Sequence, residues 1–209
     1  MRPKTQFILF ALLACTVASP APAGEGGEVH GKRTTKTRRH ISTWYSYPPG
    51  RGTNELAAVA DILDSVCFTG ARPSRDYLDW CRTNRIEAYG LMGGNAASLN
   101  TAEKRAAWLA KCLEVCDDPG YDGVDLDVEY LPLDMKDVYS ELVKSVAEAL
   151  HKKGKKVGIC VFALLHKRPE DPEFYDFAVI GKHCDRINVM CYDLHAAPAL
   201  YAQWWALPR

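Results

Sequence analysis

The sequence lacks several patterns by which common classes of protein are recognised. It contains no CxxC pair and no HxxxH spacing, so the usual zinc-ligand arrangements are missing. No GxGxxG or Walker-type phosphate loop follows any expected strand, which weakens a nucleotide-binding assignment. There is no excess charge either, because 26 basic side chains balance 26 acidic ones. We therefore expect no metal, no cofactor and no nucleic-acid partner.

Long apolar runs are also scarce, and the longest lies near the amino terminus, from Phe7 to Val17. Arg2 and Lys4 precede it, and small residues follow it as far as Ala23. This order is typical of a secretory signal peptide, whereas a membrane anchor needs about 20 apolar residues. We predict a signal peptide at residues 1–23 and no stable membrane insertion after its removal. The protein should then be secreted, or reach a lysosome-like compartment through the secretory pathway.

Residues 24–40 are rich in glycine, threonine and basic side chains without periodicity, and we expect a flexible basic leader there. Seven cysteines follow the signal peptide, an odd number that leaves at least one thiol unpaired even in a disulfide-bonded chain. Three of them, Cys67, Cys160 and Cys191, lie in apolar strand-like runs. We expect these three to be small buried hydrophobic residues.

From residue 41 onward, strand-like and helix-like segments alternate. Strands are expected at 41–47, 65–69, 86–92, 121–130, 156–164 and 186–193. Helices are expected at 55–63, 74–83, 101–116, 135–151 and 173–183, the fourth with Val138, Leu142, Val146 and Leu150 as its apolar stripe. This alternation predicts an α/β protein with a parallel sheet, either doubly wound or a (β/α)8 TIM-barrel type.

The fourth expected strand, 121–130, carries a row of acids. Side chains alternate along a strand, so Asp125, Asp127 and Glu129 share one face while the opposite face is apolar. Like charges at that spacing repel and burial raises carboxyl pKa values, so at least one group should hold its proton near neutral pH. A protonated acid can donate to an oxygen leaving group. The alternative to a catalytic strand is a solvated edge strand that merely alternates polar and apolar residues. Between the two fold types, an acidic face favours the barrel, whose interior receives every second side chain of each strand.

With Asp122 included, the acids form the pattern DxxDxDxE, which resembles the signature of glycoside hydrolase family 18, the chitinases and their relatives. Gly93-Gly94 resembles the end of the family's SxGG motif, although Leu91 stands at the usual serine position. The segment Met190–Asp193, MCYD, is similar to the family's MxYD. The resemblance covers roughly residues 41–193 and is nearest to the chitobiase and spore-wall-hydrolase side of the family.

The resemblance implies a glycosidase that cleaves β-1,4-linked N-acetylglucosamine glycans, such as chitin or chito-oligosaccharides, by substrate-assisted retaining hydrolysis. Glu129 would protonate the glycosidic oxygen, Asp127 would orient the sugar's acetamido group, and Asp125 would share a proton or hydrogen bond with Asp127. Tyr192 and Asp193 would hydrogen-bond the acetamido group or the sugar. The candidate substrate-binding residues are Tyr45, Gly93, Gly94 and Met190. Asp122 lies off this parity and is expected to be structural.

A (β/α)8 barrel typically needs about 250 residues, and about six of its eight strand–helix units are expected here. We therefore predict an incomplete barrel domain at 41–209. A truncated product of a longer enzyme is the favoured account; a self-standing protein that lost activity or closes by dimerising is the alternative. A chitinase-like carbohydrate-binding protein with little or no activity is the second functional hypothesis, although the intact Glu129 disfavours a lectin. The sequence leaves chitin, peptidoglycan and an N-glycan core open as substrates.

Overall fold

The computed structural model describes residues 40–46, 54–70, 72–163 and 174–192. The predicted signal peptide, most of the leader and Asp193 lie outside the described residues. Six strands form one sheet in the order β1-β2-β3-β4-β5-β6, and all neighbouring strands are parallel. The strands are β1 (Ser42–Ser46), β2 (Ser65–Thr69), β3 (Glu87–Gly94), β4 (Gly123–Val128), β5 (Lys156–Phe162) and β6 (Arg186–Met190). The predicted parallel α/β fold is confirmed in the described part of the chain.

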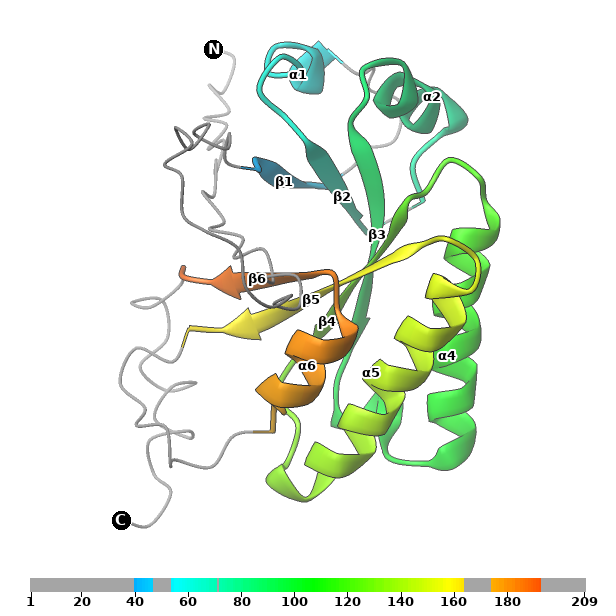
Figure 1. Ribbon diagram of the computed structural model, residues 1–209, viewed down its shortest axis with the longest axis vertical. Coiled ribbons are helices and arrows are strands. Elements are labelled where there is room, and N and C mark those ends of the chain that lie inside the picture. The colour runs from blue at the N-terminus through cyan, green and yellow to red at the C-terminus, as the bar shows by residue number, and fades with distance from the viewer. Residues whose placement is uncertain (1–39, 47–53, 71, 164–173, 193–209) are drawn as a thin grey trace, which may run out of the picture.

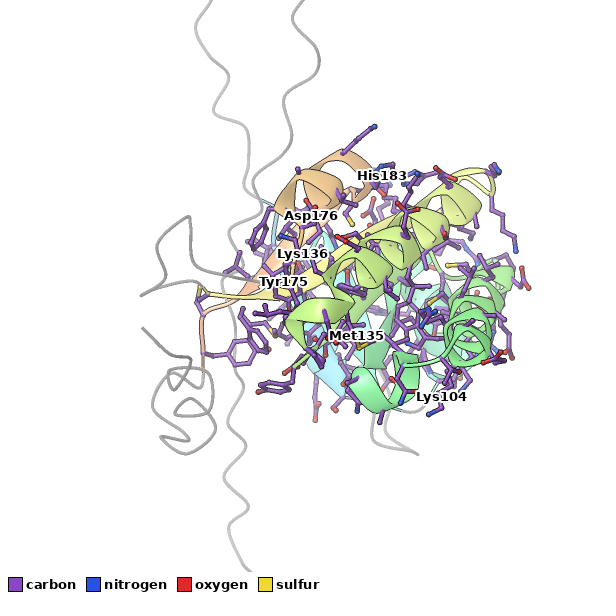
Figure 2. All side chains as sticks on the ribbon, turned by 90° about the horizontal axis from the view of Figure 1, so that it is seen from below. Lys104, Met135, Lys136, Tyr175, Asp176 and His183 are labelled. Atoms are coloured by element: carbon purple, nitrogen blue, oxygen red, sulfur yellow. The ribbon has the colours of Figure 1, made fainter. Side chains whose placement is uncertain are left out.

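Helices connect the strands on the outer side of the sheet, with α1 and α2 beside β1 to β3 and with α4, α5 and α6 beside the later strands (Figure 1). They are α1 (Asn54–Ala57), α2 (Arg75–Thr83), α3 (Ala96–Leu99), α4 (Ala102–Asp117), the 3-10 turn η1 (Leu133–Met135), α5 (Lys136–His151) and α6 (Phe177–His183). Figure 2 shows α5 beside α6, with Met135 and Lys136 at the start of α5 and His183 at the end of α6. This layering leaves the other face of the sheet for the site.

Local capping explains where several helices begin. Ser74 precedes α2 and Thr101 precedes α4, as the sequence predicts, and the Thr101 hydroxyl accepts a hydrogen bond from the Lys104 amide at 3.2 Å. The last helix, α6, starts later than predicted because Asp176 caps it, accepting from the amides of Ala178 and Val179. The first helix, α1, ends at Ala57 instead of residue 63.

The sheet is strongly curved, because strands at its two ends meet across its inner face. Strands are about 4.8 Å apart, so β2 and β6 would be about 19 Å apart in a flat sheet. Yet Nη1 of Arg186 in β6 donates to Oγ of Ser65 in β2 at 2.9 Å. Trp44 in β1 likewise contacts Tyr192, two residues beyond β6, with ring centroids 5.7 Å apart. The six strands therefore form an open arc of a barrel with a narrow interior, as predicted for an incomplete barrel.

Two hydrophobic cores fill the space between the helices and the sheet. One joins β1 to β3 with α2, and the larger joins β4 and β5 with α4, α5 and α6. The predicted stripe of α5 is partly wrong: Val138 is exposed, while Tyr139 and Val143 are buried. The reason is that α5 packs against α4, α6 and the sheet together, so its buried face is broader than one row at a spacing of four.

The cysteines follow the sheet's alternation only in part. Cys67 and Cys160 are buried, as predicted, but Cys191 is exposed because it comes after the last residue of β6. All seven cysteines of the described residues are free thiols. Within that part of the chain, no helix combines the length and the apolar character needed to cross a bilayer.

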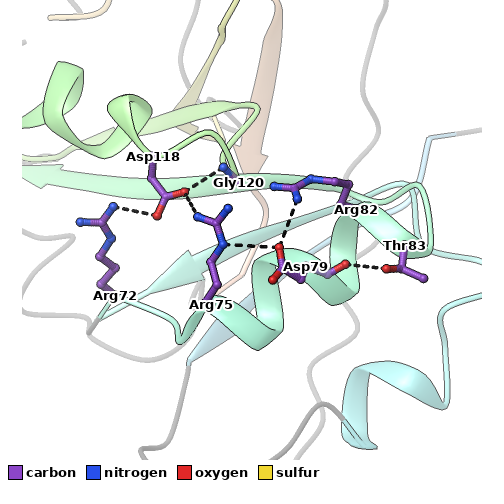
Figure 3. A network of polar contacts seen from close by, with 7 residues as sticks. All are labelled: Arg72, Arg75, Asp79, Arg82, Thr83, Asp118 and Gly120. Carbon is purple, nitrogen blue, oxygen red and sulfur yellow. Dashed lines mark hydrogen bonds and ion pairs between the residues drawn. The ribbon is translucent and has the colours of Figure 1, made fainter.

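Ion pairs fasten the turn that leads into β4 (Figure 3). Arg72 and Arg75, at the start of α2, contact opposite oxygens of Asp118 at 2.9 and 2.8 Å. Asp118 also accepts from the Gly120 amide at 2.8 Å. Because both arginines are half exposed, each pair adds at most about 1 kcal/mol of stability. Their effect is to fix the direction in which the chain enters the acidic strand.

Candidate active site

The acids of β4 lie on the inner face of the curved sheet. Val124, Leu126 and Val128 point the other way, are fully buried and pack in the larger core. Asp125 is also fully buried, whereas Asp127 and the residue after the strand, Glu129, are partly buried. The row therefore runs from the closed interior toward the end of the strand, where the side chains reach solvent. This is the end at which barrel enzymes place their catalytic groups.

Asp122 has the structural position predicted for it. Its Oδ2 accepts from the Ala88 amide at 2.8 Å, and its own amide donates to the Ala88 carbonyl at 2.7 Å. Its carbonyl accepts from the Lys156 amide at 2.9 Å. Asp122 thus joins β3, β4 and β5 just before β4 begins. The residue holds the entry of the acidic strand and lies off the acidic face.

Asp125 is held by an arginine that the sequence analysis missed. Nε of Arg186 donates to Oδ1 of Asp125 at 2.9 Å, and Nη2 contacts Oδ2, so both carboxylate oxygens are engaged. Arg186 lies on β6, in register with Gly158 of β5, which is itself in register with Asp125. The predicted sharing of a proton between Asp125 and Asp127 is therefore replaced by an ion pair. A signal was present in the sequence: Arg186 has the same parity as Asn188 and Met190 along the strand, so it should share their inward-facing side.

Asp127 and Glu129 form the outer pair of the row. Burial and then the charge of Asp125 raise the pKa of Asp127. Burial and then the charge of Asp127 raise the pKa of Glu129. The interaction between the two carboxyl groups lowers the pKa of Asp127 and raises that of Glu129, so Glu129 is the member of the pair that is favoured to hold a proton. The Oδ1 atom of Asp127 is buried and has no hydrogen-bond partner among the described residues. The pair is arranged as a proton donor beside a carboxylate.

Four further predicted residues divide between the two faces of the sheet. Gly93 is in register with Asp127, on the acidic face, and Met190 faces the interior in phase with Arg186. Gly94 lies on the opposite face, toward the helices. A Cβ at this position would lie 3.1 Å from Val128 and 3.4 Å from the Trp108 indole, so the glycine allows α4 to pack closely on the sheet. Its prediction as a substrate-binding residue is wrong.

Tyr45 is the second correction. Its ring packs on Phe68 and Tyr77 in the core beneath α2, and its hydroxyl donates to Glu55 at 3.2 Å. Its neighbour Trp44 takes the inward position and meets the ring of Tyr192 edge to face. The sequence analysis named Tyr45 as a substrate-binding candidate, and the structure brings Trp44 to the interior in its place. Asp193, the last residue of the MCYD segment, lies outside the described residues.

Metal ligation receives no support from the described residues. Among them, no group of three or more His, Cys, Asp or Glu side chains is arranged to hold a metal ion. The Asp125 carboxylate, which would be the natural first ligand, already has both oxygens on Arg186.

The chain is similar in sequence to a glycosylase and in fold to chitinases. It is 31% identical over 108 residues to the uncharacterized glycosylase YvbX of Bacillus subtilis, which is 51% of this chain and 31% of YvbX. Among solved structures, a chitinase from Chromobacterium violaceum matches with a TM-score of 0.61 at 20% identity, over 74% of this chain and 56% of that one. A class V chitinase from Pseudomonas fluorescens matches with a TM-score of 0.57 at 19% identity, over 67% and 50%.

The spore cortex-lytic enzyme SleL of Bacillus megaterium matches with a TM-score of 0.61 at 14% identity, over 83% of this chain and 47% of that chain. At such identities the solved structures support the fold, the (β/α)8 barrel of chitinases, of which six parallel strands are described here. The chain spans about a third of its curated relative and about half of these structures. The family model for glycosyl hydrolases family 18 matches residues 88–206, which include the acidic strand and are more than half of the chain. The chain therefore belongs to glycosyl hydrolases family 18.

Proposed function

We propose that this protein is a glycoside hydrolase and that Glu129 is its proton donor. The observation that carries the proposal is the Asp127–Glu129 pair, in which burial and the charge of Asp127 raise the pKa of the outermost acid, Glu129. An acid that retains its proton near neutral pH can protonate the oxygen of a leaving sugar. Membership of the family and the glycosylase and chitinase neighbours support the same reaction class.

The geometry of the pair bears on the nucleophile. In retaining glycosidases with two catalytic carboxylates, the two groups are about 5 Å apart and the scissile bond lies between them. Asp127 and Glu129 lie two residues apart on the same face of one chain segment, so both carboxyl groups approach a bound sugar from the same side. Asp127 is thus badly placed to attack the anomeric carbon. We propose that the nucleophile comes from the substrate, as the oxygen of a 2-acetamido group.

In the proposed reaction, Glu129 gives its proton to the bridging oxygen as the glycosidic bond breaks. The acetamido oxygen forms the new bond to the anomeric carbon, and the positive charge of the resulting oxazolinium ion lies next to the Asp127 carboxylate. Water then opens this ring and returns a proton to Glu129, with retention of configuration. The Tyr192 hydroxyl, carried into the interior beside Trp44, is proposed to donate to the acetamido group.

We propose β-1,4-linked N-acetylglucosamine glycans as the substrate class, because the mechanism needs an acetamido group next to the bond that is cleaved. Chitinases and spore cortex-lytic enzymes among the structural neighbours support two versions of this class, chitin-like and peptidoglycan-like. Parallel assays with a fluorogenic chitobioside and with purified peptidoglycan separate these versions.

The test compares the wild type with Glu129→Gln, which keeps the side chain's size and removes the transferable proton. Turnover of the chitobioside should fall by about 10²–10⁴-fold, the usual contribution of a general acid. Glu148→Gln is the matched control, since Glu148 is exposed on α5, away from the acid row, and its turnover should equal that of the wild type.

Equal turnover in the wild type and Glu129→Gln would overturn the role of Glu129. If neither protein turns over substrate but both bind N-acetylglucosamine oligosaccharides in a calorimetric titration, the protein is a carbohydrate-binding relative without hydrolytic activity. Binding and turnover are therefore measured on the same preparations.

A further inference from the structure

Arg186 makes the widest set of contacts across the interior of the curved sheet. From β6 it reaches β4 through Asp125 and β2 through Ser65 Oγ at 2.9 Å. Its guanidinium carbon also lies 3.4 Å from the centroid of the Tyr89 ring on β3, close enough for a cation–π contact. A single side chain thus connects strands at both ends of the sheet through the buried end of the acid row.

The fold leaves room for this pair. Position 158 on β5 is glycine, and a Cβ there would lie 1.9 Å from Asp125 Oδ1 and 2.7 Å from Arg186 Nε. The side chain of Arg186 is 9% exposed and that of Asp125 is 0% exposed. Removing two charges from water costs about as much as their attraction returns, so such a pair adds little net stability. The pair still changes the electrostatic field at the neighbouring acids, because the positive charge of Arg186 offsets the negative charge of Asp125.

We propose that Arg186 is a positioning residue of the proposed glycosidase: by engaging both oxygens of Asp125, it offsets the charge of this carboxylate beside the Asp127–Glu129 pair that delivers the proton. The catalytic part of this inference, the delivery of a proton to the substrate, rests on the proposed function. Without the guanidinium, Asp125 would face Asp127 along the strand with no counter-ion. Its negative charge would then act on the outer pair without compensation.

Other charged groups near Asp125 are engaged elsewhere. Lys156 on β5 pairs with Glu87 on β3, and the His40 ring contacts Ser65 at 3.0 Å. Besides its two members, the titratable and charged groups near the Asp125–Arg186 ion pair are His40, Cys67, Glu87, Tyr89, Asp127, Lys156, Cys160 and Cys184. Among the described residues, Arg186 is the cation that directly contacts the Asp125 carboxylate.

The proposal predicts opposite effects from the two halves of the ion pair. Arg186→Met leaves one uncompensated negative charge, so the Asp127–Glu129 pair should titrate about one pH unit or more higher than in the wild type. Asp125→Asn leaves one uncompensated positive charge, so the same pair should titrate lower. The double variant is neutral again at this place and should titrate close to the wild type.

The measurement is a carbon-13 NMR titration of the carboxyl groups in the substrate-free protein, joined to the pH profile of kcat/KM. The acidic limb of the profile should move in the same direction as the NMR titration. Arg82→Met is the control, because it removes an exposed arginine that pairs with Asp79 on α2 and should shift neither measurement.

Unchanged titration in Arg186→Met, or the same direction of shift in both single variants, would overturn the proposal and leave Arg186 a structural residue. If Arg186→Met does not fold, as judged by circular dichroism, the downward shift in Asp125→Asn and its reversal in the double variant decide the question. An inactive wild type that shows the predicted titrations would count against the proposed function and would leave the positioning of the proton intact.

Discussion

Trp44 and Tyr192 meet edge to face, at an interplanar angle of 80°, although the first lies on β1 and the second follows β6. In a flat sheet of six strands, these residues would be about 24 Å apart. Their contact shows that the sheet closes around an interior that contains the acid row at one side and two aromatic rings at the other. The interior thus has a polar side and an aromatic side.

The two tyrosines first considered for the site should respond differently to loss of a hydroxyl group. Tyr192→Phe should lower kcat about tenfold, since one hydrogen bond to the acetamido group is worth about 1 kcal/mol or somewhat more. Tyr45→Phe should leave kcat unchanged, because its hydroxyl donates to Glu55 on α1, away from the acid row. Steady-state kinetics with the chitobioside measure both, and a tenfold loss in Tyr45→Phe would contradict the face assignment.

The raised pKa values of the outer pair predict how stability depends on pH. A carboxyl group whose pKa is higher in the folded protein binds its proton more tightly there than in the unfolded chain. Its contribution is fully present below the unfolded value and is lost as pH rises through the raised folded value. For Asp127 and Glu129, this places the loss above the ordinary values of 3.8 and 4.5.

Asp127→Asn should therefore be more stable than the wild type at pH 7 and equal to it near pH 3, while its turnover falls. The measurement is Tm across this pH range. Asp134→Asn, on the exposed turn η1, is the control and should change neither quantity. A variant less stable than the wild type at every pH would show that the Asp127 carboxylate contributes to the fold.

The packing around the ion pair predicts a contrast between two glycines. Gly158→Ala should destabilise the protein by about 1–3 kcal/mol, because the new methyl group overlaps Asp125 and Arg186. Gly181→Ala should be neutral or stabilising by about 0.5–1 kcal/mol, because this glycine lies in α6 with nothing within 4 Å of a Cβ. Urea denaturation measures both. Equal stability of the two variants would mean that Asp125 and Arg186 can move aside for the new methyl group at little cost.

Asp122 predicts a loss of stability that is separate from catalysis. Asp122→Ala should cost about 1–3 kcal/mol, because the Ala88 amide between β3 and β4 loses its partner. Asp117→Ala removes a similar carboxylate from an exposed pair with Lys153 and should cost less than about 1 kcal/mol. Midpoints of urea denaturation compare the two, and similar values would argue against a strand-joining role for Asp122.

Much of the site follows from local sequence. The alternation of Asp125, Asp127 and Glu129 with three apolar residues is enough to place the acids on one face of a strand, because successive side chains of a strand point in opposite directions. Thr101 similarly marks a helix start through the chemistry of a single cap, whereas Ser74 precedes α2 without a side-chain capping hydrogen bond. These properties depend on neighbours in the chain, and the structure agrees with them.

What the sequence by itself determined is thus the order of strands and helices, the acidic face of β4 and the family signature. The tertiary structure alone decided that Arg186, 61 residues beyond Asp125, is its partner, and that Trp44 rather than Tyr45 turns inward. The physical reason is that these relations depend on the register and curvature of the sheet, which bring distant strands together. In a five-residue strand with aromatic side chains on both faces, periodicity cannot tell the inside from the outside.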